Sequence, residues 1–108
     1  MNCHCESCRR ATASPVTTFV GVPWGAFEWT GEEPKEYASS PGVTRDFCGT
    51  CGTPMFFADE RDRDNIHLYV ATLMDPNAIP PQAHVHTEEA LEWFTISDHL
   101  RRFPEAGQ

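Results

Sequence analysis

The chain has 108 residues, of which 40% are apolar and 11% aromatic, so it has the length and apolar content of one small folded domain. Sixteen acidic residues against eight basic ones give a formal net charge of -8. Nucleic acids and anionic membranes are bound mainly through Lys and Arg, so this balance argues against both as partners. No segment approaches the roughly 20 apolar residues of a membrane-spanning helix, and the first residues do not resemble a signal peptide. We therefore expect a cytoplasmic protein.

The pattern of turn-forming residues predicts a mostly β fold in a single domain, residues 1–108. Nine Pro and seven Gly residues fall at short intervals, which favours short strands over long helices. Alternating, β-branched or aromatic segments then give the expected strands. In chain order these are 16–22, 27–30, the edge strand 35–39, 43–47, 54–58, 66–73 and 83–86.

The remaining segments are expected to form turns, short helices and a tail. Residues 59–65 are highly charged and indicate a solvated loop. Short helical turns are expected where Pro76 follows the capping residue Asp75 and where Thr87 caps residues 87–90. Trp93 and Phe94 are expected to pack on the core, and residues 101–108 to form a polar tail.

Five cysteines carry the strongest chemical information in the chain. In the cytosol thiols stay reduced, and closely spaced cysteines there are more often metal ligands or redox groups than disulfides. Cys48 and Cys51 form a C-x2-C motif at the expected tip of a hairpin, with Gly49 and Gly52 to allow a tight turn. A redox C-x2-C would instead open a helix after a strand, so we predict that this knuckle binds zinc.

Cys3, Cys5 and Cys8 form a C-x-C-x2-C cluster close to the start of the chain. Three thiolates would give a zinc ion three ligands and leave one tetrahedral position. If water or a substrate thiol takes that position, the site is of the catalytic type; if His4 or Glu6 takes it, the site is structural. The spacing supports both alternatives equally, and also leaves open whether the five cysteines hold one ion or two.

Three stretches resemble the glutathione-dependent formaldehyde-activating enzyme family, which also includes centromere protein V. They are residues 3–10, which read CHCESCRR; residues 47–54, which read FCGTCGTP; and residues 81–84, which read PQAH, followed by Trp93. Their order and spacing make the resemblance specific, and they extend over nearly the whole chain.

The resemblance implies a small β-tent fold that binds zinc at two sites. Cys3, Cys5 and Cys8 match the ligands of the family's catalytic zinc, and Cys48 and Cys51 match two ligands of its structural zinc. The family's N-terminal strand, which supplies a further C-x-C, has no counterpart in this sequence. We therefore expect one or two Zn²⁺ ions per chain.

The activity that the resemblance implies is that of a carbon–sulfur lyase, which acts on a glutathione adduct such as S-hydroxymethylglutathione or on another small thiol adduct. Arg9 and Arg10 follow the cluster directly and can pair with a substrate carboxylate or offset the negative charge of the thiolates. The alternative function is a zinc-stapled module that binds a partner protein and has no catalytic activity.

Other residues with suggestive patterns have ordinary structural interpretations. His84 and His86 are expected to share one face of a strand, where one histidine packed and one exposed is the common arrangement. His67 and His99 are expected to be surface or hydrogen-bonded groups. The three tryptophans, Trp24, Trp29 and Trp93, are expected in the core.

Overall fold

The computed structural model describes residues 1–106 and divides the chain into two compact units. The first unit combines residues 1–19 with the segment that starts at Asp75, and the second is the continuous segment from Val20 to Met74. Among the described residues the chain has eight strands and one α-helix, so the predicted mostly β fold is confirmed. Five short 3-10 turns complete the structure: Trp24–Ala26, Glu60–Asp62, Val70–Thr72, Pro76–Ala78 and Thr87–Glu89.

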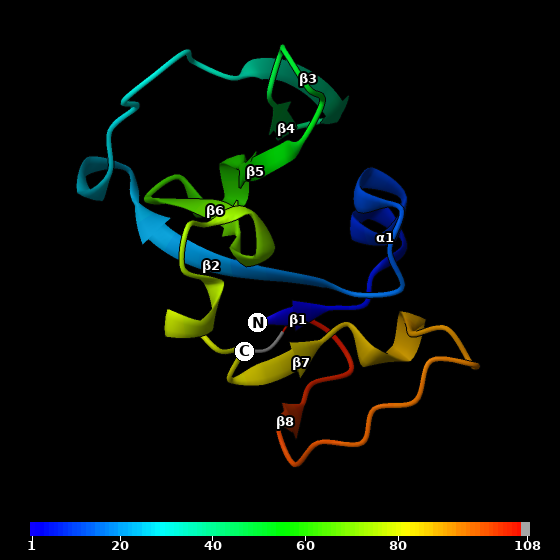
Figure 1. Ribbon diagram of the computed structural model, residues 1–108. Helices are drawn as coiled ribbons and strands as arrows, with labels where there is room; N and C mark the ends of the chain where they lie inside the picture. The colour runs from blue at the N-terminus through cyan, green and yellow to red at the C-terminus, as the bar shows by residue number, and fades with distance from the viewer. Residues whose placement is uncertain (107–108) are drawn as a thin grey trace. The chain divides into compact units, whose positions relative to one another are not determined.

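The first unit is built on a very short central strand, β1 (Asn2–Cys3). It pairs antiparallel with β2 (Thr17–Pro23) and parallel with β7 (Ala83–Val85), which pairs in turn with β8 (Arg101–Arg102) (Figure 1). Helix α1 (Glu6–Thr12) follows β1 directly. The small core of this unit therefore forms around β1, from Cys3, Cys8 and Val85 with the partly buried Phe19 and Phe103.

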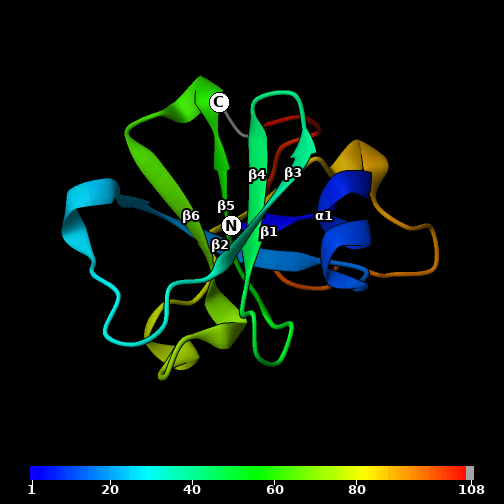
Figure 2. The same cartoon turned by 90° about the horizontal axis from the view of Figure 1, so that it is seen from above.

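The second unit is an antiparallel meander in which neighbours in sequence are neighbours in the sheet. Its strands are β3 (Lys35–Ser40), β4 (Val43–Phe47), β5 (Pro54–Asp59) and β6 (Asn65–Tyr69), in that order across the sheet. Figure 2 shows β3 beside β4. Strand β3 is the first strand in the order across the sheet, so it lies at the edge, as the sequence predicts. The buried apolar residues of the second unit are Phe56, Ile66, Tyr69 and Val70.

The turn between β4 and β5 is the predicted cysteine knuckle. The amide of Cys48 donates to the carbonyl of Thr53, and the amide of Gly52 donates to the carbonyl of Cys48. Gly52 has a φ of 77°, in the left-handed region that favours glycine, whereas Gly49 is not among the residues with positive φ. Of the two glycines, the backbone conformation therefore requires only Gly52.

Two strand predictions were wrong in part or in whole. Residues 27–30 form no strand: Phe27 packs edge-on against Trp29 in an aromatic cluster, so the alternating apolar pattern reflects that cluster and not a sheet. The strand predicted at 66–73 ends at Tyr69, because the chain turns into the 3-10 segment Val70–Thr72, whose first residue is buried.

Three predictions in the first unit also need correction. Trp93 is 71% exposed and does not pack on the core. The predicted tail contains β8, which pairs with β7, while residues 107 and 108 lie outside the described residues. Thr87 is not the cap of its helical turn: that position is taken by His86, and the Thr87 hydroxyl donates to the carbonyl of Phe103.

Helix α1 was not predicted, because its seven residues are too few to show a periodic apolar pattern. Among the described residues, no helix has both the length and the apolar character needed to cross a membrane.

The Gly52→Ala substitution tests the backbone conformation of the knuckle. A Cβ at this position meets no atom within 4 Å, so any cost comes from the positive φ alone. We expect a loss of about 1 kcal/mol in the free energy of unfolding, measured by urea denaturation. The control is Gly31→Ala, where the added Cβ is also unobstructed and φ is not positive; equal effects of the two substitutions would contradict the assignment.

Candidate metal centre

The structure brings together the sulfur atoms of Cys3, Cys5 and Cys8. These atoms all lie within 4.8 Å of one another, an arrangement that can hold a metal ion. Cys3 is the last residue of β1, Cys5 immediately precedes α1, and Cys8 lies in the first turn of that helix. Cys3 and Cys8 are each 3% exposed, and Cys5 is half-buried, so the cluster has one side closer to solvent.

The C-x2-C half of the cluster is set by the start of α1. Cys5 occupies the N-cap position with extended backbone, and its sulfur accepts a hydrogen bond of 3.3 Å from the amide of Cys8. Cysteine here takes the role that Ser or Asp usually has at a helix start. The helix therefore fixes the spacing between these two sulfurs, and β1 fixes the third.

Crowding of the three sulfurs separates the pKa values of their thiols. Hydrogen bonds from Cys3 and Cys8 lower the pKa of the Cys5 thiol well below its usual value, while hydrogen bonding to Cys5 and Cys8, together with burial, raises the pKa of Cys3. Protons shared among closely packed sulfurs are the groups that a divalent ion displaces. Three thiolates are soft ligands that suit zinc, so the residues present fit the predicted ion.

Neither of the two nearby candidates for a fourth protein ligand joins the sulfur cluster. Within the described part of the first unit, the ligand group contains the three cysteines and no His, Asp or Glu. His4 points its Nε2 atom at His84, and the carboxylate of Glu6 accepts a hydrogen bond of 2.9 Å from Arg10. The geometry therefore favours the alternative in which a tetrahedral position is left for a non-protein ligand.

A row of hydrogen-bonded side chains runs from the buried His4, which lies between two of the cysteines in sequence, through the buried His84 to the exposed Asp98. The Nε2 atom of His4 is 2.8 Å from Nδ1 of His84, and Nε2 of His84 is 2.9 Å from a carboxylate oxygen of Asp98. The hydrogen bond from His84 lowers the pKa of Asp98, so this carboxylate is the acceptor. The two imidazole rings are joined through Nε2 of His4 and Nδ1 of His84, so the contact to Asp98 on one side and to His4 on the other holds the orientation of the His84 ring.

Sequence reasoning gave His84 only its packing role and did not identify Asp98. His86 does not share a face with His84, because the strand ends at Val85 and His86 adopts a left-handed backbone conformation with a φ of 55°. His67 is hydrogen-bonded to Asp62, as expected for a histidine outside the site.

The knuckle cysteines lie in the second unit. Cys51 is exposed, and its sulfur is 3.0 Å from the hydroxyl of Thr53, which lowers the pKa of the thiol. Within residues 20–74 no third His, Cys, Asp or Glu completes a ligand group with Cys48 and Cys51. Zinc binding by this pair stays a prediction.

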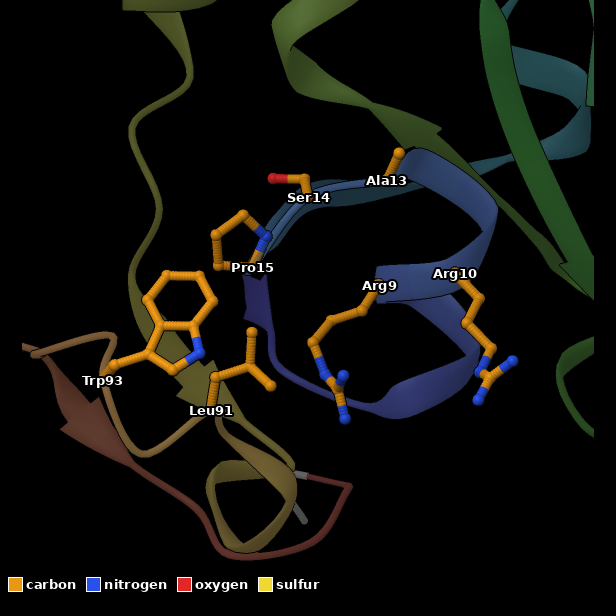
Figure 3. A pocket seen from close by; sticks show the side chains of 7 residues that line it. All are labelled: Arg9, Arg10, Ala13, Ser14, Pro15, Leu91 and Trp93. Carbon is orange, nitrogen blue, oxygen red and sulfur yellow. The ribbon is translucent and has the colours of Figure 1, made fainter.

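An open hollow of about 280 Å³ lies beside α1 in the first unit. Trp93, Leu91 and Pro15 form its apolar part, and the side chain of Arg9 extends toward Leu91 while that of Arg10 extends away (Figure 3). The guanidinium of Arg9 donates to the backbone carbonyls of His4 and Glu89, and in the described chain it has no carboxylate partner. Its positive charge is thus available next to the loop that carries the sulfurs.

Substitution of Asp98 tests whether the hydrogen-bonded row of His4, His84 and Asp98 contributes to metal binding by the cysteines. We expect Asp98→Ala to weaken zinc binding about tenfold, because the ring of His4 loses its fixed orientation although no ligand is changed. The measurement is competition with a chromophoric chelator. Asp98→Asn keeps an acceptor oxygen and should restore most of the affinity, and Glu92→Ala serves as the control; equal affinities of the two alanine variants would refute this role.

Comparison with known proteins agrees with the resemblance seen in the sequence. The family model described as glutathione-dependent formaldehyde-activating enzyme matches residues 1–89. An uncharacterized lyase of Schizosaccharomyces pombe is 39% identical over 56 residues, which are 52% of this chain and 40% of the yeast protein. The chain thus spans less than half the length of that relative. Because the family match covers most of the chain and both cysteine motifs, the chain belongs to the glutathione-dependent formaldehyde-activating enzyme family.

Proposed function

We propose that this protein is a zinc-dependent carbon–sulfur lyase that acts on the adduct of formaldehyde with a small thiol, with glutathione as the preferred thiol. One observation carries the proposal: three sulfur atoms within 4.8 Å of one another, joined by no fourth protein ligand from the described part of the first unit, in a member of this family. Such a site has room for a substrate thiol.

In the synthetic direction, the thiol sulfur attacks the carbonyl carbon of formaldehyde. A carbon–sulfur bond forms as the carbonyl π bond breaks, and the proton lost by the thiol goes to the former carbonyl oxygen. A zinc ion held by Cys3, Cys5 and Cys8 would supply the positive charge that favours the thiolate form of the substrate at neutral pH. The lyase direction is the reverse of these steps.

The hollow beside α1 supports glutathione as the thiol. Glutathione carries two carboxylates. Two of the five N–H groups of Arg9 donate to backbone carbonyls, which leaves three N–H groups for a substrate carboxylate. Trp93 and Leu91 provide apolar contact for the peptide backbone and methylene groups. In this proposal Arg9 holds a carboxylate while the thiol reaches the metal cluster.

The exposure of Trp93 also favours the alternative, a zinc-stapled module that binds a partner protein through this apolar surface. The two functions differ in whether a substrate thiol binds at the fourth coordination position of the zinc ion. X-ray absorption at the zinc edge would show a rise in sulfur ligands upon addition of glutathione for the enzyme and no change for the interaction module.

The lyase activity itself is tested by exchange spectroscopy of formaldehyde with glutathione. We expect zinc-loaded protein to accelerate formation and breakdown of the adduct, and Cys8→Ser to reduce the acceleration by at least about 100-fold, because one of three ligands is lost. Ser7→Ala, an exposed neighbour on α1, should retain the wild-type rate. Absence of acceleration by the zinc-loaded wild type would exclude the activity.

The role of Arg9 is tested by thiol binding to the zinc-loaded protein, measured by calorimetry. We expect Arg9→Gln to weaken glutathione binding about tenfold and to leave binding of N-acetylcysteamine, which lacks a carboxylate, within about twofold. Arg10→Gln removes the same charge from a side chain already paired with Glu6, and should have little effect on either thiol. Equal weakening of both thiols by Arg9→Gln would assign Arg9 a purely structural role.

A further inference from the structure

A second hollow, of about 230 Å³, lies wholly within the second unit and is unrelated to the sulfur cluster. Its lining has two chemical components. One is aromatic, with Trp24, Trp29 and Phe56, and the other is acidic, with Glu33, Glu36 and Asp46. Neither the family nor the proposed lyase activity accounts for this combination.

The aromatic component has the form of a partly open cage. Trp29 is stacked on Phe56 with ring centroids 5.6 Å apart, and Trp24 meets Phe56 edge-on at 6.2 Å. Trp24 is 45% exposed and Trp29 36%, so substantial parts of both indoles remain uncovered. The faces of aromatic rings carry negative electrostatic potential and attract organic cations.

The acidic component is a row across the sheet that ends at one of these rings. Glu36 on β3 lies directly opposite Asp46 on β4, and Asp46 lies directly opposite Phe56 on β5. Directly opposed residues on neighbouring strands point to the same face of a sheet. Like charges in this position destabilise a sheet, so Glu36 and Asp46 are costly to the fold without a counter-charge.

Asp46 is the centre of this row and has no partner to offset its burial. It is only 8% exposed, and its Oδ1 atom has no hydrogen bond partner among the described residues. No ion pair to Asp46 occurs in residues 1–106, because the neighbouring Arg45 lies over the ring of Phe57 and donates to the hydroxyl of Tyr69. Burial and the nearby Glu36 raise the pKa of Asp46 to about 6, which leaves the group ionised at pH 7.5.

We propose that this hollow is a binding site for an organic cation that carries N–H groups, with the charge held by Asp46 and Glu36 and the alkyl part against Trp24, Trp29 and Phe56. The carboxylate of Asp46 requires a hydrogen bond donor, which a primary ammonium group has and a quaternary ammonium group lacks. The volume admits one head group with a short alkyl chain, such as a free alkylamine or the side chain of a lysine in a peptide.

Nuclear magnetic resonance of the full chain gives a direct test at pH 7.5, because the indole N–H signals of Trp24 and Trp29 report on the hollow and that of Trp93 serves as an internal control. We expect n-butylammonium to shift the first two signals and not the third, and the neutral n-butanol to shift none. Tetramethylammonium should bind at least about tenfold more weakly. Equal shifts with n-butanol, or equal affinity for tetramethylammonium, would overturn the proposal.

A lysine blocked at both ends distinguishes the two sources of the ammonium group. Binding of n-butylammonium alone would assign the site to free amines, and binding of both compounds would extend it to lysine side chains of a protein partner.

Two variants and a matched control connect the binding to these side chains. Asp46→Asn keeps the shape of the side chain and should weaken n-butylammonium binding at least about tenfold. Trp29→Leu, at a partly exposed position, should weaken n-butylammonium binding about fivefold. This variant leaves Asp46 unchanged and so tests the aromatic component separately. Glu32→Gln removes one charge from the loop beside the hollow and should leave the affinity within about twofold. Wild-type affinity in both Asp46→Asn and Trp29→Leu would refute the site.

Discussion

The first unit depends on the convergence of three sulfur atoms that a sequence of six residues brings within one coordination sphere. Strand β1 is only two residues long, but it is held on both sides, by β2 and by β7. The chain then turns at Cys5 into α1, and the sulfur of Cys5 accepts the amide of Cys8. Because the same sulfurs contribute much of the small apolar core, the candidate metal centre and the core of this unit are one structure. A divalent ion at the cluster would therefore stabilise the fold as well as provide chemistry.

The polar chain from His4 to Asp98 extends this arrangement to a segment almost a hundred residues away in sequence. His4 is fully buried; its Nε2 atom is hydrogen-bonded to Nδ1 of His84, whereas its Nδ1 atom has no hydrogen-bond partner among the described residues. Asp98, the last side chain of this row, is exposed, so its carboxylate remains in contact with solvent. Hydrogen bonds thus tie the loop that carries the sulfurs to His84 and Asp98.

The sequence predicted local features better than long-range ones. The strands of the second unit from β3 onward and the hairpin that carries the cysteine knuckle were predicted, because β-branched and aromatic runs, turn residues and a C-x2-C motif are all read within a few positions. The cluster of Cys3, Cys5 and Cys8 was found for the same reason. In contrast, the partnership of His84 with Asp98 and the opposition of Glu36 and Asp46 depend on strand register and on loop paths, which no local pattern contains. The expectation that all three tryptophans lie in the core was wrong: Trp24, Trp29 and Trp93 are each at least 36% exposed, because side-chain size predicts burial only when enough neighbouring structure exists to cover it.

The discontinuous path of the chain through the first unit has a consequence for the order in which the protein matures. The second unit, residues 20–74, is continuous and contains the local hairpins, so it has all its partners soon after leaving the ribosome. Strand β1 is translated about 80 residues before β7, so one of its two pairing partners is missing during that interval. Throughout that interval the three thiols lie on a scaffold that lacks β7, so capture of a metal ion by these thiols would be linked to the arrival of β7 during biosynthesis.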